Sequence, residues 1–410
     1  MKKLVLIIMT ASGIGLSAHS QTLDDYVKTA AENNPGLQSR YREYEAALQK
    51  VPQAAALPDP AISFGYFISP VETRVGPQQA KFSLTQMFPW FGTLKAQGNA
   101  AALQAEARLQ AFMDARNQLV YQVAEAYYPL YELQEWTRIE QENILILESY
   151  KSLANTRYQN GKGAMVDVLR ADMMLKEATT NLSVLRQKEK PLITRFNQVL
   201  NRPEGEAVVV PDTLMITEYR EGYRKDSLLS ANPLIDELEL KVRASEAGEL
   251  AVRRQGLPRI GLGLDYVLVG NRTDMDLPDN GKNVLMPMVS VSIPIFRSKY
   301  KAAQKEAQLM QDSYSLQKKE LGNRLVTAYD KAWFEIQQQH ELARLYEQQT
   351  EESQQSLDLL FAAYSNSGKD FEEVLRMQQQ VLKYQKLKAS ALTQYQIARA
   401  EMDYLTAKTY

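Results

Sequence analysis

Acidic and basic residues occupy matching positions in two parts of this sequence, each beside a short turn that contains glycine. Asp167 and Glu373 begin helical stretches, and a basic residue follows each acid three positions later, within side-chain reach on a helix. Such groups can form ion pairs or line a path for ions, but they include no strong nucleophile. The candidate residues are Asp167, Glu373, Arg170, Arg376, Lys162, Lys369 and Asp370, and the turn glycines are Gly161, Gly163 and Gly368.

The scarcity of histidine and cysteine limits the catalytic chemistry open to this chain. It has two histidines and no cysteine. His19 lies in a predicted signal peptide, and His340 lies in a polar helical stretch, where we interpret it as a solvated or capping residue. Nucleophilic and metal-hydrolase sites built on these residue types are therefore unavailable. Counting does not exclude carboxylate-only chemistry, but the sequence predicts no enzyme, no catalytic cofactor and no resident metal.

The overall composition favours long helices and gives no electrostatic reason to expect a nucleic-acid partner. The chain is rich in Ala, Gln, Leu, Glu and Lys, which are good helix formers. Its 48 basic and 49 acidic residues nearly cancel, whereas nucleic-acid binding requires a basic patch. A mean hydropathy of −0.38 argues against a polytopic helical membrane protein.

The first 20 residues have the pattern of a secretory signal peptide. Lys2 and Lys3 precede an apolar stretch that ends at Leu16, and Ala18-His19-Ser20 is a small-x-small cleavage site. A short N-terminal membrane anchor is the alternative, but the apolar stretch is too short to span a bilayer comfortably. We therefore expect an exported chain that, without cysteine, is not lipidated at a cysteine.

The sequence contains an internal repeat, and its two halves share the order of their landmarks. We expect a first repeat over 21–203, a linker over 204–222 and a second repeat over 223–410. Chance similarity between helical segments would not preserve the order of proline and strand signals, so duplication is the better explanation. The matched pieces are Asn33-Asn34-Pro35 and Ala231-Asn232-Pro233, Leu57-Pro58 and Leu257-Pro258, Phe88-Pro89-Trp90-Phe91 and Ile293-Pro294-Ile295-Phe296, and Tyr158-Gln159-Asn160 and Tyr364-Ser365-Asn366.

Each repeat is predicted to contain a short helix, a second helix, two strands, one very long helix and a final helix. Each short helix ends at an Asn-Pro step, because the residue before proline is pushed out of the helical region. The predicted long helices are 92–159 and 298–365, and each would measure about 100 Å. The other predicted helices are 23–33, 35–56, 164–200, 226–231, 233–255 and 370–407.

Four segments alternate between large apolar and small or polar residues, as strands of a transmembrane barrel do. They are predicted at 61–70, 80–89, 258–269 and 284–294, each about long enough to cross a bilayer when tilted. An ordinary half-buried sheet is the alternative interpretation of any one strand. Four strands cannot close a barrel and eight would leave a filled interior, so a conduit requires at least a trimer with twelve strands.

The long helices carry a heptad pattern, which predicts coiled-coil packing into an α-helical barrel. In the last helix, apolar residues step by three and four from Val374 to Leu405 with Lys388 as the one charged member. The fold class is therefore mainly α with a small β part. Pro129 predicts a kink or local bulge at 127–130, without a counterpart in the second repeat, where Ala332 stands. A secreted coiled-coil scaffold or adaptor without a pore is the alternative architecture.

Taken together, these pieces resemble the TolC family of outer-membrane efflux proteins over residues 22–408. The resemblance implies a trimeric exit duct of a tripartite efflux pump, which conducts substrate passively from the periplasm after docking to an adaptor protein and an inner-membrane pump. It implies no cofactor. The resembling pieces are Glu32-Asn33-Asn34-Pro35, Leu57-Pro58-Asp59-Pro60, Gln86-Met87-Phe88-Pro89-Trp90-Phe91-Gly92, Val166-Asp167-Val168-Leu169-Arg170 and Phe196-Asn197-Gln198-Val199-Leu200-Asn201-Arg202-Pro203.

Two of these pieces, Leu-Pro-Asp-Pro and Phe-Pro-Trp-Phe-Gly, are similar to the branch that partners heavy-metal pumps. Drug export and general export stay open as alternatives. The family also carries an acidic ring at its closed periplasmic end, in the place that Asp167 and Glu373 occupy. We therefore expect these acids to narrow the tip and select cations, with Arg170 and Arg376 holding the closed state by ion pairs. The alternative is that each acid only interacts favourably with the positive N-terminal end of its helix.

Overall fold

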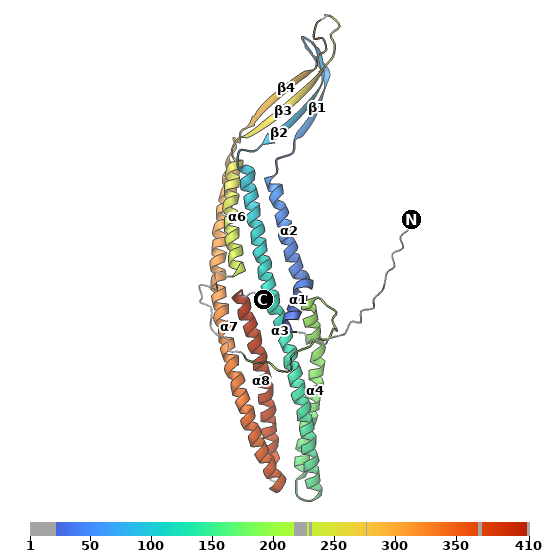
Figure 1. Cartoon of the computed structure of the whole chain (residues 1–410), viewed down its shortest axis with the longest axis vertical. Helices are drawn as coiled ribbons and strands as arrows, with labels where there is room; N and C mark the ends of the chain where they lie inside the picture. Colours follow the sequence, from blue (N-terminus) through green and yellow to red (C-terminus); the bar gives the residue numbers. More distant parts are fainter. Residues whose placement is uncertain (1–21, 217–227, 229–231, 276, 368–370, 408–410) are drawn as a thin grey trace, which may run out of the picture. The chain divides into compact units, whose positions relative to one another are not determined.

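The computed structural model describes residues 22–216, 228, 232–275, 277–367 and 371–407 (Figure 1). The predicted signal peptide 1–20, most of the short helix predicted at 226–231, and Gly368, Lys369 and Asp370 lie outside the described residues. Described helices are α1 (Leu23–Asn33), α2 (Pro35–Ala55), α3 (Thr93–Gln159), α4 (Met165–Leu200), α6 (Pro233–Gln255), α7 (Ser298–Ser367) and α8 (Phe371–Leu405). The strands are β1 (Ala61–Thr73), β2 (Gly76–Phe88), β3 (Arg259–Val269) and β4 (Val284–Ser292). A mainly helical fold with a four-stranded sheet is confirmed.

The Asn-Pro steps begin α2 and α6 in the same way. The side chain of Asn34 accepts a hydrogen bond from the backbone N–H of Leu37, and that of Asn232 accepts one from Leu234, both at 3.0 Å. In each helix a proline occupies the first turn, where its missing N–H leaves no hydrogen bond unmade. These two repeat landmarks therefore have the same structural role.

The chain divides into two compact units. One comprises Met1–Asn33, Gln122–Thr217 and Gln339–Ile397, and the other comprises Asn34–Tyr121, Glu218–Gln338 and Ala398–Tyr410. The second unit holds the sheet, and the first holds the turn between α3 and α4. Each of the two longest helices, α3 and α7, contributes to both units.

All four strands form one antiparallel sheet in the order β1-β2-β3-β4, so the two predicted hairpins lie next to each other. The central pairing joins the halves of the repeat, with Phe82 opposite Tyr266 and Leu84 opposite Leu264. Both strands of the first hairpin extend closer to the turn than predicted. A register shift between Tyr66 and Val71 accommodates Pro70 within β1, because a bulge tolerates the proline that a regular ladder would not.

The two faces of the sheet differ in the way that the alternation predicts. The register places most of the large apolar side chains of the four strands on one face, and many are strongly exposed: Ile62 is 79%, Phe64 62% and Val289 73% exposed. The other face carries small and polar residues, including Ser83 opposite Asp265, together with a few apolar ones such as Met286 and Met288 on β4. Lys81 forms an ion pair with Asp265 on that face.

The long helix α3 continues through Pro129 as one uninterrupted helix. The bend predicted at 127–130 stays a prediction, since continuity of the helix neither requires nor excludes it. Proline also lies inside α2, at Pro52, and inside α4, at Pro191. None of the helices within the described ranges is both long enough and apolar enough to cross a membrane.

Candidate functional site

The candidate site is built at the turn between α3 and α4, in the first of the two units. Gly161 has a φ of 69°, which an L-residue rarely adopts, and this conformation lets the chain reverse. The backbone N–H of Gly161 donates to the carbonyl of Tyr158 at 2.9 Å, and that of Lys162 donates to Arg157 at 2.8 Å. Lys162 itself is exposed at the end of the hairpin.

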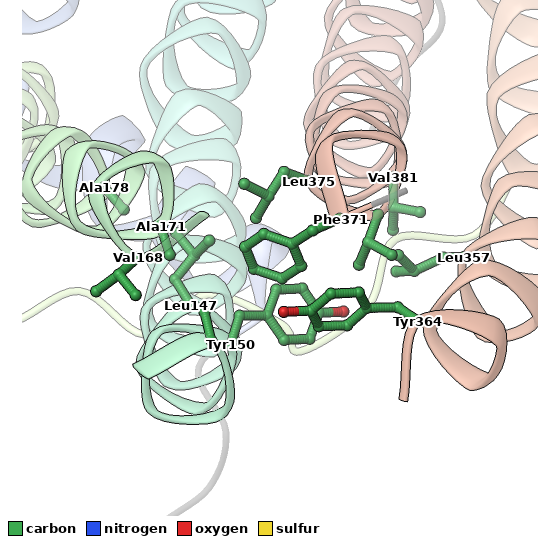
Figure 2. Close-up of a cluster of buried hydrophobic side chains, with 12 residues drawn as sticks. Leu147, Tyr150, Val168, Ala171, Ala178, Leu357, Tyr364, Phe371, Leu375 and Val381 are labelled. Atoms are coloured by element: carbon green, nitrogen blue, oxygen red, sulfur yellow. The ribbon is translucent and has the colours of Figure 1, made fainter. Parts of the chain in front are cut away.

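A buried apolar cluster, here called the tip cluster, packs α3, α4, α7 and α8 together beside this turn (Figure 2). Its aromatic members are Tyr150, Tyr364 and Phe371, and the rings of Tyr364 and Phe371 lie 4.5 Å apart. Burial raises the pKa of Tyr150 to about 12. The tip cluster holds the two helical hairpins in contact. Its full membership is Leu147, Tyr150, Ala154, Val168, Ala171, Ala178, Leu357, Tyr364, Phe371, Val374, Leu375 and Val381.

Arg157 joins the two hairpins at the edge of the tip cluster. Its Nη1 donates to the carbonyl oxygen of Ser365 at 2.9 Å, which links α3 to α7. Its guanidinium carbon lies 5.1 Å from the centre of the Tyr364 ring, a distance at which a cation and an aromatic face attract each other. Tyr364 is fully buried, and burial, followed by the nearby charge of Asp167, raises its pKa.

The predicted acid–base pairs form in one repeat only. Arg376 forms an ion pair with Glu373 three residues earlier on α8, as the spacing indicates. The pairing expected between Arg170 and Asp167 is wrong, because Arg170 Nη1 instead contacts Glu372 Oε2 at 2.9 Å. A spacing of three residues puts two side chains of one helix within reach of each other, but here Arg170 pairs with an acid on the neighbouring helix instead. Arg170 therefore links α4 to α8.

A further charged group lies nearer the middle of the first hairpin. Asp172 on α4 accepts a hydrogen bond from Lys151 on α3, at 2.6 Å, and its other carboxylate oxygen is 2.8 Å from Lys176 Nζ on its own helix. These two lysines lower the pKa of Asp172 to about 2, with Lys151 as the larger cause. The carboxylate therefore stays ionised at any physiological pH and keeps α3 attached to α4.

The internal repeat indicates where the site lies, but it does not predict how equivalent residues of the two repeats differ in burial. Tyr158 and Tyr364 are repeat equivalents, yet Tyr158 is 46% exposed while Tyr364 is fully buried. Sequence reasoning missed Arg157, Tyr364, Glu372 and Asp172 as site residues. Tyr364 could have been found from the sequence, since it is one of the matched residues of the repeat. The roles of the other three depend on which helices pack against each other. Lys369, Asp370 and Gly368 lie outside the described residues.

The site contains charged groups but no arrangement that resembles a catalytic or metal centre. Among the described residues, no three His, Asp or Glu side chains are gathered so that they could hold a metal ion. The charges instead form contacts between helices. Such contacts can open or close a passage without making or breaking a covalent bond.

Comparison with known proteins gives a family model that covers most of the sequence. The model for outer membrane efflux proteins matches residues 26–190 and 225–408. This chain belongs to that family. The two matched segments correspond to the two halves of the internal repeat. The family places the chain in the outer membrane as an efflux channel with periplasmic helices, and its members are transporters and not enzymes.

Individual relatives share this fold at low sequence identity. The outer membrane efflux protein BepC of Brucella suis biovar 1 (strain 1330) is 24% identical over 320 residues, which are 74% of this chain and 67% of BepC. The outer-membrane channel OprN superposes with a TM-score of 0.77 and 18% identity, covering 94% of this chain and 90% of OprN. CusC gives 0.76 and 16%, covering 94% and 91%.

The heavy-metal branch suggested by two sequence pieces is not singled out by these likenesses. OprN and CusC match with nearly equal TM-scores and coverage, so similarity of fold does not separate them. The comparisons therefore support the family and not a particular cargo.

Proposed function

We propose that three copies of this chain form one continuous duct, with a twelve-stranded barrel in the outer membrane and a helical tunnel in the periplasm. The observation that carries this proposal is the exposed apolar face of a sheet whose outer strands, β1 and β4, are both unpaired edges. Lipid cannot hydrogen-bond to an open edge, so a sheet in a bilayer must close on itself. Three copies of four strands close a barrel wide enough for a lumen.

The opposite face of the sheet suits a water-filled interior. It presents Ser63, Ser83 and Ser290 together with Lys81, which pairs with the buried carboxylate of Asp265, and its apolar members include Met286 and Met288. Large apolar residues facing lipid and small or polar residues facing water are what a barrel with an aqueous lumen requires. A secreted scaffold without a pore would have to leave the apolar face in water, and this makes it the weaker alternative.

The end of the first hairpin offers a surface for docking to a periplasmic adaptor protein and, through it, an inner-membrane pump. Apolar side chains near the start of α4 are exposed in this chain, although exposed apolar groups normally seek a partner. Conduction through the duct would be passive, since energy would come from the pump. The exposed side chains are Met165, Val166, Leu169 and Met173.

Asp167 and Glu373 are proposed to line the periplasmic aperture and to favour cations there. Both lie in the first turns of their helices, α4 and α8. In a trimer the two acids would supply six carboxylates around one opening, and a ring of like charges raises the local concentration of counter-ions.

Removing these carboxylates tests both the duct and its aperture. In planar lipid bilayers the wild-type protein should form cation-selective channels, and the double variant Asp167→Ala with Glu373→Ala should lose most of that selectivity. The control variant, Glu148→Ala with Glu177→Ala, removes the same charge from exposed positions farther along the helices and should behave as wild type. Unchanged conductance and selectivity in the first variant would leave the acids only a role at the helix dipole.

A further inference from the structure

An open pocket of about 530 Å³ lies in the second unit, where the strands meet the helices. Its walls come from the end of α2, the start of α3 and the end of α6, together with the segments that lead into β1 and β3. The side chains that matter for its chemistry are Asp59, Trp90, Thr93, Gln97, Arg254 and Arg259. We call this site the junction pocket.

The junction pocket gathers two positive charges and one negative charge that are not paired with each other. Within the described part of the chain, Arg254, Arg259 and Asp59 form no ion pair. Asp59 stands between two prolines in a segment that is tied to the sheet, because Gln86 Nε2 donates to the carbonyl of Pro58 at 2.7 Å. The carboxylate of Asp59 is therefore carried by a segment that is anchored to the sheet.

The pocket also contains the N-terminal end of the long helix α3. This end carries partial positive charge, and α3 has no acidic residue in its first turn to answer it. Thr93, the first residue of the helix, lines the pocket and is 2% exposed. Its hydroxyl oxygen is buried without a hydrogen-bond partner among the described residues. A buried hydroxyl in this state calls for a polar ligand.

Arg254 is held across the start of α3 by a close fit. Its Nη1 donates to the carbonyl oxygen of Phe91 at 2.8 Å. Gly92 has a φ of 77°, and a Cβ at that position would lie 2.7 Å from Nη1 of Arg254. The repeat equivalent of Gly92 is Arg297, which follows Phe296, so the second repeat cannot build the same contact. The chain therefore has this arrangement at one of its two strand-to-helix junctions.

We propose that the junction pocket binds the phosphoethanolamine headgroup of a phospholipid. The phosphate would lie against Arg254, Arg259 and the Thr93 hydroxyl at the helix N-terminus, where charge-assisted hydrogen bonds to an anion are strong. The ammonium group would lie against Asp59. A zwitterionic headgroup matches both signs of charge in the pocket, whereas an anionic headgroup offers no positive group to pair with the Asp59 carboxylate.

A lipid is the expected source of this headgroup because the surroundings of the pocket are apolar and exposed. Leu57 is 50% and Phe91 79% exposed, and the Trp90 ring forms part of the wall. Tryptophan is characteristic of the membrane–water boundary, where its amphipathic ring sits at headgroup level. The inference rests on the proposed placement of the sheet in the bilayer, with this end of the sheet toward the periplasmic leaflet.

Native mass spectrometry of the detergent-solubilised full chain, titrated with phosphatidylethanolamine or phosphatidylglycerol, tests the proposal. The wild-type protein should retain phosphatidylethanolamine preferentially. Arg259→Gln should reduce its retention about tenfold, the effect of losing one charge-assisted contact. Asp59→Asn should retain both lipids about equally. Arg253→Gln, which removes the neighbouring exposed arginine outside the pocket lining, should match wild type.

Three results would overturn the proposal. Equal lipid retention in Arg259→Gln and Arg253→Gln would remove the pocket as the site. An undiminished preference for phosphatidylethanolamine in Asp59→Asn would remove the zwitterionic match. Displacement of the lipid by millimolar inorganic phosphate would show that the pocket takes a free anion. The same spectra also give the number of chains in the complex. Because all residues that line the pocket belong to one chain, loss of lipid binding can be told apart from failure to form a trimer.

Discussion

Replacing Phe64 by arginine is expected to abolish assembly of the protein in the outer membrane. Phe64 lies on the apolar face of the sheet, is 62% exposed and packs against Phe82 with ring centres 4.9 Å apart. An arginine facing lipid near the bilayer midplane costs about 2–4 kcal/mol per copy, and three copies would raise this to roughly 6–12 kcal/mol. The amount of trimer in the outer-membrane fraction, measured after extraction and gel electrophoresis without heating, reports the effect.

The neighbouring residue provides the matched control. Ser63 is exposed on the opposite face of the same strand, which is the face proposed to line the lumen. Ser63→Arg introduces the same side chain and charge one residue away, so it should assemble at close to the wild-type amount. Equal assembly of the two variants would show that the apolar face does not contact lipid, and it would remove the main support for the barrel.

The second large effect is expected where the two helical hairpins are tied together. Arg157→Ala with Arg170→Ala removes the contact of Arg157 with the Ser365 carbonyl and the ion pair of Arg170 with Glu372. A hydrogen bond to a charged group contributes about 1.5–3 kcal/mol, and an exposed ion pair contributes at most about 1 kcal/mol. Their loss in every protomer should favour an open tip, and single-channel conductance should rise severalfold.

A charge-matched variant separates opening of the tip from a general loss of positive charge. Arg138→Ala with Arg195→Ala also removes two arginines, but Arg138 pairs within α3 and Arg195 pairs with Glu125 inside the first hairpin. This variant should conduct as wild type does. If both double variants conducted equally, the contacts between hairpins would not control the tip.

Much of the fold could be predicted because its signals are local. The Asn-Pro steps at Asn34 and Asn232 place helix starts through one side chain and one proline. The alternation in the strands follows from the geometry of a single strand. The prediction ended the first strand at Pro70. The structure continues the strand past it through a shift in register, which depends on the partner strand.

The contacts at the tip could not be predicted in the same way. The repeat pairs residues 158 and 364, but burial of Tyr364 and exposure of Tyr158 depend on the rotation of each helix against its neighbours. Arg170 had two acids within reach, and only the packing of α4 on α8 decides for Glu372. Sequence spacing describes one helix at a time, so it cannot choose between partners on different helices.

The junction pocket illustrates the same limit over a longer distance. Asp59 and Trp90 belong to two pieces that carried the family resemblance, whereas Arg254 and Arg259 lie more than 160 residues further along the chain. The pairing of β2 with β3 brings these segments to one place. Neither half of the pocket has a recognisable pattern by itself, since two arginines near a strand are unremarkable until an acid and a helix N-terminus lie beside them.

The molar mass of the purified protein tests the central claim of a three-chain duct most directly. Light scattering with correction for bound detergent should give a complex of three chains that precipitates or aggregates when detergent is removed. The apolar face of the sheet would then be accounted for by lipid and detergent. A monodisperse single chain that stays in solution without detergent would contradict the account, because the exposed strands would then belong to an ordinary sheet.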